Sequence, residues 1–179
     1  MFDIDNTVLV LVDVQGKLAQ LMADKDELFI NLQRMVKGAQ ALNLPILWME
    51  QIPEKLGETI PELQQLLPKQ SPLAKKSFSC TGKDEFNKAL KESGRKQVLI
   101  MGIETHICVY QTALDLVADG FEVEVVSDAV SSRVAANKDL ALRKMQDCGV
   151  GLTSTEMILF ELMRSSEHGA FRDIQNAIK

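Results

Sequence analysis

Cysteine and histidine are scarce in this sequence, and each scarcity removes a class of site. The 179 residues include three cysteines and two histidines. Cys80, Cys108 and Cys148 show no CxxC spacing, so they predict neither a disulfide framework nor a zinc knuckle. The cysteine count is odd, and the acidic N-terminal residues are unlike a signal peptide. Together these two features indicate reduced thiols and predict a cytoplasmic protein. His106 and His168 lie too far apart for an HExxH site, so we expect no metal and no cofactor.

Long hydrophobic runs and an excess of positive charge are also missing. No apolar run approaches the roughly 20 residues that a helix needs to cross a bilayer, so we expect no membrane association. The net charge is −5, which argues against nucleic acid as a partner because a phosphate backbone needs a basic surface. Hydrophobic residues at 46% and charged residues at 25% are ordinary for a globular protein, and residues 1–179 fit one domain.

Strands and helices alternate along the chain. Residues 7–14 read TVLVLVDV, a nearly continuous apolar run typical of a parallel strand buried on both faces. Further strands are predicted at 45–50, 97–102, 121–126 and 150–153. Helices are predicted at 28–42, 84–93, 106–119, 134–148 and 157–163, whereas 68–82 is the least regular stretch. The alternation predicts an α/β fold, a doubly wound parallel sheet with helices on both faces and ligands at the carboxyl ends of its strands.

Cys108 is the candidate nucleophile. It falls in the first turn of the helix that follows the strand ending at Gly102. The unpaired N–H groups and positive dipole of a helix N-terminus favour a thiolate and could also hold an oxyanion. Alternatively, Cys108 is a small buried hydrophobic residue. His106 is two residues away and faces another side of the helix, so it is not the expected base.

Asp13 and Lys75 are the candidate partners of Cys108. Asp13 ends an apolar strand, where burial would raise its pKa towards that of a working general base. An ordinary capping or solvated carboxylate is the alternative for Asp13. Lys75, within the irregular stretch, could supply a cation that stabilises the ionised forms of both groups, and taken alone it also reads as a surface lysine.

Several motifs follow one another in a set order: LVDVQ at 11–15, KKSFS at 75–79, GIETHICV at 102–109 and SDAVSSR at 127–133. Through these motifs the sequence resembles the isochorismatase-like cysteine hydrolase superfamily over essentially its whole length. It is most similar to the isochorismatase-domain-containing proteins of that superfamily. The resemblance implies a six-stranded parallel sheet of Rossmann-like topology with strand order 3-2-1-4-5-6.

The resemblance also implies a set of site residues. A catalytic Asp-Lys-Cys triad falls on Asp13, Lys75 and Cys108. A cis peptide bond is implied between Ile103 and Glu104, and an oxyanion hole is implied from the backbone N–H groups of Glu104 and Cys108. Relatives assemble into homo-oligomers, so a dimer or tetramer is expected; the apolar stripe after Ala170 could serve that contact or could pack on its own sheet.

The implied activity is hydrolysis of a C–N bond in a small amide, carbamoyl compound or imide through a thioester on Cys108. The metal site of nicotinamidases is not expected, because residues 48–51 (WMEQ) hold no histidine. Four side chains are expected to line the substrate pocket, although each could instead be core or rim packing: Trp48, Gln51, Phe78 and Tyr110. A different reading is a non-hydrolytic binding or scaffold protein, or a thiol that responds to redox conditions.

Overall fold

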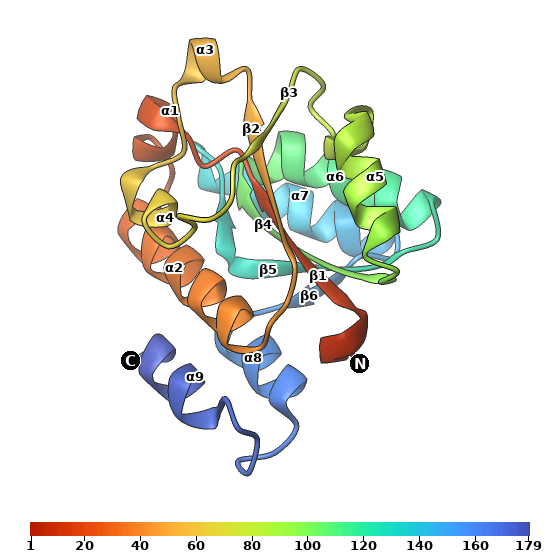
Figure 1. The fold of residues 1–179 in the computed structure, drawn as a ribbon. Coiled ribbons are helices and arrows are strands. Elements are labelled where there is room, and N and C mark those ends of the chain that lie inside the picture. The colour runs from red at the N-terminus through yellow and green to blue at the C-terminus, as the bar shows by residue number, and fades with distance from the viewer.

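The computed structural model describes residues 1–179 as a six-stranded parallel sheet between two layers of helices (Figure 1). The strands are β1 (Thr7–Val12), β2 (Ile46–Gln51), β3 (Leu73–Lys75), β4 (Gln97–Ile103), β5 (Glu122–Ser131) and β6 (Gly151–Thr153). Their order across the sheet is β3-β2-β1-β4-β5-β6, and neighbouring strands pair in parallel. The predicted doubly wound sheet and its strand order are confirmed.

The helices divide between the two faces of this sheet. They are α1 (Gly16–Gln20), α2 (Lys25–Ala41), α3 (Pro53–Leu56), α4 (Pro61–Gln64), α5 (Asp84–Glu92), α6 (Tyr110–Ala118), α7 (Ala135–Asp147), α8 (Thr155–Met163) and α9 (Phe171–Ile178). Residues of α2, α4, α8 and α9 share one hydrophobic cluster, and residues of α5, α6 and α7 share the other (Figure 1). No helix has both the length and the apolar character needed to cross a membrane.

The central strand β1 joins the two clusters. All six of its residues are buried, and its side chains alternate between the faces. Leu9 and Leu11 belong to the cluster with α2, whereas Val8, Val10 and Val12 belong to the cluster with α5 and α6. Burial on both sides explains why the strand reads as one apolar run.

Two segments differ from the pattern expected of the sequence, and for a third the sequence left two roles open. Strand β3 lies inside residues 68–82, which were expected to be irregular. It was not expected because its three residues are too few to show a period, and it pairs only with β2. The helix expected at 106–119 begins with a π-helical turn at Thr105–Val109 before α6. The apolar stripe after Ala170 packs on its own domain, where the side chain of Ile174 in α9 is fully buried.

Gly102 near the end of β4 allows the backbone of β4 to lie very close to that of β1 beside the candidate site. Its φ is +122°, a conformation that side chains disfavour. A Cβ atom placed there would lie 2.1 Å from the carbonyl oxygen of Val12 in β1. Backbone atoms cannot move away as a flexible side chain would, so the position requires glycine.

We predict that Gly102→Ala destabilises the fold by roughly 3 kcal/mol or more, because strain and overpacking add at one position. Gly120→Ala is the matched control: Gly120 also has a positive φ, of +83°, but a Cβ there meets no atom within 4 Å. The control should lose only about 1–2 kcal/mol, the cost of a left-handed residue. Urea unfolding of both variants checks this, and equal losses would contradict the proposed clash.

Candidate active site

The three predicted catalytic residues converge at the carboxyl ends of the strands. Asp13 follows β1, Lys75 is the last residue of β3, and Cys108 lies in the π-helical turn after β4. Lys75 Nζ is 2.7 Å from Asp13 Oδ2, and each of these two residues is only 2% exposed. Asp13 and Cys108 line one cavity of about 110 Å³. Residues far apart in the sequence thus form one buried cluster.

Lys75 is held as a fixed cation. Its Nζ donates to Asp13 Oδ2 at 2.7 Å and to Gln51 Oε1 at 2.6 Å. It also donates to the carbonyl oxygens of Ser77 at 3.1 Å and Phe78 at 2.9 Å. An ammonium group has three N–H bonds, so these acceptors use all of its donors. The side chain therefore has no donor left for a substrate and acts on the site through its charge.

The carboxylate of Asp13 is unevenly satisfied. Oδ2 accepts from Lys75, whereas the buried Oδ1 has no hydrogen-bond partner. Burial raises the pKa of Asp13 above its usual value, although the charge of Lys75 and an interaction with the Cys108 thiol oppose that rise. The negative charge of Glu50 adds a smaller upward contribution to the same pKa. A carboxylate with one free oxygen and a raised pKa can accept a proton.

The raised pKa of Cys108 favours the thiol over the thiolate expected from its place at a helix N-terminus. Burial raises its pKa most, and the negative charge of Asp13 raises it further, while Lys75 acts in the opposite direction. The helix dipole would lower the pKa of Cys108, but burial and the charge of Asp13 outweigh it. Both of these come from other elements of the fold. Cys80 is fully buried, and burial raises its pKa to about 12.

Glu104 lies between the end of β4 and the π-helical turn that holds Cys108, and its peptide bond with Ile103 is cis. No protein group accepts from its backbone N–H. Its side chain is turned to Arg133, whose Nε donates to Oε1 at 2.8 Å and whose backbone N–H donates at 3.1 Å. Burial would raise the pKa of Glu104, but the hydrogen bonds from Arg133 outweigh it and lower the pKa. His106 is directed elsewhere, because its Nδ1 is 2.9 Å from Ser132 Oγ.

Two of the four expected pocket residues line the cavity beside Cys108, namely Gln51 and Phe78. Trp48 does not, because alternate residues of β2 face opposite sides of the sheet. Its ring joins the cluster under α2, and its Nε1 donates to Thr59 Oγ1 at 2.8 Å. Tyr110 lines a different hollow with α7 residues such as Lys144.

Three apolar side chains of the cavity were missed by the sequence reading: Leu18 of α1, Leu56 of α3 and Ile107 of the π-helical turn. Each follows the carboxyl end of a strand, where open α/β sheets bind their ligands. That rule could have pointed to the segments after β1, β2 and β4. The two short helices α1 and α3 gave no periodic pattern from which to choose the side chains.

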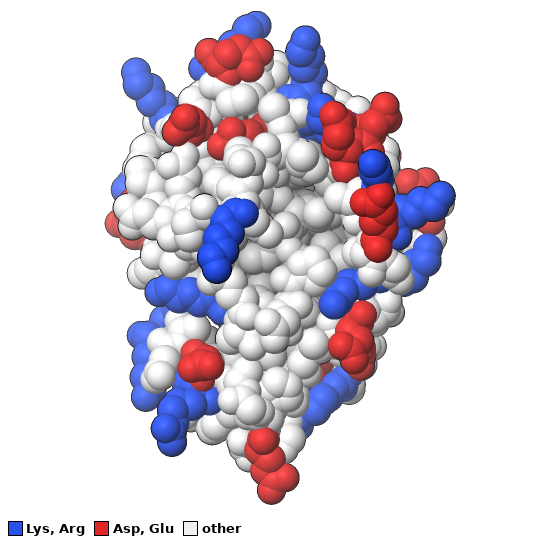
Figure 2. Space-filling model, in the orientation of Figure 1, with Lys and Arg blue, Asp and Glu red and all other residues white.

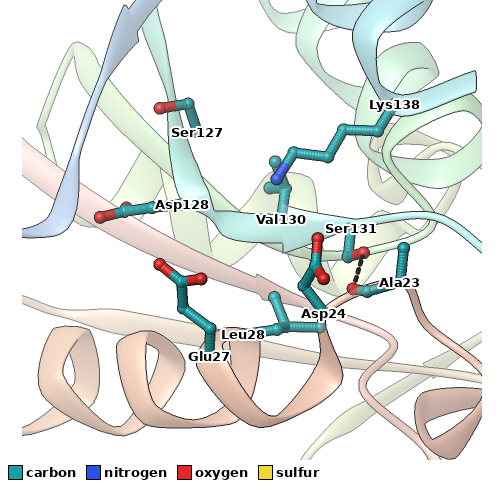
Figure 3. A pocket seen from close by; sticks show the side chains of 9 residues that line it. All are labelled: Ala23, Asp24, Glu27, Leu28, Ser127, Asp128, Val130, Ser131 and Lys138. Carbon is teal, nitrogen blue, oxygen red and sulfur yellow. Dashed lines mark hydrogen bonds between the residues drawn. The ribbon is translucent and has the colours of Figure 1, made fainter. Parts of the chain in front are cut away.

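A second hollow of about 180 Å³ lies between the start of α2 and β5 (Figure 3). Asp24, Glu27 and Asp128 line it together with Lys138 of α7. One carboxylate oxygen of Asp128 accepts from the backbone N–H and the Oγ1 of Thr155, at 2.8 and 2.9 Å. These bonds tie β5 to the first residue of α8, so Asp128 has a structural role away from Cys108. Nowhere do three His, Cys, Asp or Glu side chains gather closely enough to hold a metal ion.

Comparisons with known proteins agree with this geometry. A model of the Isochorismatase domain matches residues 7–157. Isochorismatase domain-containing protein 1 of Salmo salar is 37% identical over 174 residues, which are 97% of this chain and 61% of that protein. The chain thus spans less than two thirds of that relative's length.

Two solved structures are similar throughout. The MAR1 ribonuclease of Caenorhabditis elegans superposes with a TM-score of 0.93 at 33% identity, covering 99% of this chain and 91% of that one. The YcaC gene product of Escherichia coli, described as an octameric hydrolase of unknown specificity, has a TM-score of 0.93 at 26% identity and covers 98% and 88% of the two chains. With the domain match across most of its length, this chain belongs to the isochorismatase family.

Proposed function

We propose that the protein is a cysteine hydrolase that cleaves the C–N bond of a small amide, carbamoyl compound or imide. The observation that carries the proposal is the buried Asp13 carboxylate, with one oxygen paired to Lys75 and the other free, in the cavity that also holds Cys108. Leaving a buried acceptor unpaired costs about 1–3 kcal/mol. A site that binds a substrate explains that cost, because the free Oδ1 of Asp13 can accept a proton during the reaction.

The first half of the reaction forms a thioester. The sulfur of Cys108 attacks the substrate carbonyl carbon while its proton moves to Asp13 Oδ1. The backbone N–H groups of Glu104 and Cys108 hold the resulting oxyanion. Asp13 then protonates the leaving nitrogen, the C–N bond breaks, and ammonia or an amine departs. Lys75 keeps Asp13 in position throughout and balances its charge.

The second half restores the enzyme. A water molecule loses a proton to Asp13 as its oxygen attacks the thioester carbonyl carbon, and the same N–H groups hold the second oxyanion. Collapse of this intermediate breaks the C–S bond and releases the acid. The proton on Asp13 returns to the sulfur of Cys108, so the carboxylate and thiol of the resting site are regenerated.

The raised pKa values suit this cycle. A thiol whose pKa is raised does not lose its proton to bulk water, so the proton leaves only as the carbon–sulfur bond forms. The raised pKa of Asp13 makes it a stronger base than an ordinary aspartate. The same features count against a redox-responsive thiol, because sensor cysteines have low pKa values and are accessible to solvent, whereas the pKa of buried Cys108 is raised.

RNA is not part of the proposal, although one similar structure is a ribonuclease. The net charge of −5 gives no basic footprint. On the face shown in Figure 2, Lys and Arg lie mostly around the rim with Asp and Glu among them, and the middle of the face is largely uncharged. A small-molecule substrate in a cytoplasmic homo-oligomer is the proposed setting. The octameric relative supports self-association, and three free cysteines suit a reducing compartment.

We predict that Cys108→Ala abolishes turnover of any amide identified by a screen for ammonia release, because no sulfur remains to attack. Asp13→Asn should lower kcat about 10²–10⁴-fold, the usual contribution of a general base. Cys148→Ala is the matched control, since Cys148 is exposed and should be dispensable. Full turnover by the Cys108→Ala protein would exclude nucleophilic catalysis.

The pH dependence of kcat/KM follows from the two raised pKa values. Asp13 must be deprotonated to act as a base, so activity is lost as the pH falls through its pKa. Because that pKa is raised, the acid limb should lie above the pH of about 3.9 expected for an ordinary aspartate. The profile should show no rise near the ordinary cysteine pKa of about 8.5. An acid limb at the ordinary aspartate value, or a rise at the ordinary cysteine value, would contradict this assignment.

A further inference from the structure

The cavity beside Cys108 has a mostly apolar wall. Its aliphatic and aromatic lining residues come from five different parts of the fold: Leu18, Leu56, Phe78, Ile103 and Ile107. Phe78 is also 56% exposed, so it lies at the outer edge of the cavity. A ligand in this space touches hydrocarbon on most sides, and a charge placed there would lose its hydration without compensation.

The other polar side chains of the wall are largely engaged within the protein. The Oε1 of Gln51 accepts from Lys75 at 2.6 Å, and its Nε2 donates to the carbonyl oxygen of Lys76 at 2.8 Å. The carboxylate of Glu104 is engaged by Arg133. Besides the second N–H of the Gln51 amide, what remains for a ligand is the free Oδ1 of Asp13, the thiol of Cys108 and the backbone N–H groups assigned to the oxyanion.

The charges around the cavity leave no counter-ion for an anion. Asp13 is paired with Lys75, and Glu104 is paired with Arg133. Glu50 is also 4% exposed, and its Oε1 accepts from the backbone N–H and the Oγ1 of Thr59, both at 2.7 Å. No cation pairs with Glu50, and its negative charge reaches Asp13. The surroundings are therefore neutral to slightly negative, which disfavours a substrate carboxylate or phosphate.

The size of the cavity limits the acyl group. About 110 Å³ is available. Sites for drug-sized ligands start at about 300 Å³, and an apolar cavity of about 150 Å³ holds one benzene ring. A cavity of this size suits a short acyl chain of a few carbon atoms and not a drug-sized group.

We propose that the site acts on uncharged, short-chain aliphatic amides and excludes acyl groups that carry a charge. This inference rests on the proposed amide hydrolysis and narrows its substrate class. The apolar wall binds the alkyl chain, while the carbonyl group lies against Cys108 and the leaving nitrogen faces Asp13.

Pairs of amides that differ in charge and hardly in shape test the proposal by ammonia release. Isovaleramide and malonamate have the same branching, with two methyl groups in one and two carboxylate oxygens in the other. Butyramide and β-alaninamide differ by a terminal methyl in place of an ammonium group. We expect kcat/KM to be at least tenfold higher for the neutral member of each pair. Equal or faster cleavage of a charged member would overturn the substrate class and leave the hydrolase proposal standing.

Alkylation of Cys108 tests the cavity separately from turnover. Iodoacetamide and iodoacetate are a neutral and an anionic reagent of the same size, and mass spectrometry of peptides reports the rate at each cysteine. The ratio of the two rates should be at least tenfold larger at Cys108 than at the exposed Cys148 of the same molecule. Equal ratios would overturn the inference. If no amide is cleaved but the ratios differ as expected, amide hydrolysis fails and the selectivity of the cavity for neutral ligands holds.

A charge introduced into the wall gives the matched variant. Leu56→Lys places an ammonium group at the cavity, and we expect it to lower the preference of Cys108 for iodoacetamide over iodoacetate at least threefold. Leu56→Met keeps the wall apolar and should preserve that preference. A preference that is unchanged in Leu56→Lys, or lost equally in both variants, would contradict control of selectivity by the charge of the wall.

Discussion

The ion pair between Lys75 and Asp13 constrains the rest of the site. A buried ammonium and a buried carboxylate each lose hydration, and such a pair persists only when further hydrogen bonds satisfy its atoms. Lys75 meets this requirement through Gln51 and the carbonyl oxygens of Ser77 and Phe78. Asp13 does not, since its Oδ1 is left free. Oδ1 is therefore the oxygen left to accept a proton, in the cavity that Asp13 shares with Cys108.

The strand order makes this pair possible. Lys75 ends the edge strand β3, and Asp13 follows the central strand β1. Gln51 ends the intervening strand β2 and accepts a hydrogen bond from Lys75. On the other side of β1, the close approach of β4 at Gly102 leads into the turn that holds Cys108. The proposed chemistry therefore needs the ends of four neighbouring strands, and it uses no charged group beyond these residues.

Much of the fold could be predicted from the sequence, because buried parallel strands carry an unmistakable apolar signal. Strand β1 and the strand before Cys108 stood out in this way, and Asp13 was prominent as a carboxylate that ends such a run. Strand β3 could not be found by periodicity, since three residues show no period. The placement of Lys75 next to Asp13 likewise depends on pairing between distant segments, which a single sequence does not reveal.

The positions of Trp48 and Tyr110 away from the cavity beside Cys108 have equally specific causes. Trp48 and Gln51 are three residues apart in β2, so alternation places them on opposite faces and only one could reach the cavity. Tyr110 lies past the π-helical turn and faces α7. The pKa of Cys108 was judged from the local helix terminus, yet the burial and the Asp13 charge that raise it come from elsewhere in the fold.

We propose that the resting site holds a neutral Cys108 thiol beside Asp13, so that the sulfur loses its proton only during attack. Infrared spectroscopy of the S–H stretch near neutral pH tests this most directly, with a Cys108→Ser protein subtracted to isolate one thiol. We expect an S–H band from Cys108 that shifts in Asp13→Asn, because the neighbouring acceptor changes. Absence of that band, with thiolate absorption in the ultraviolet, would contradict it.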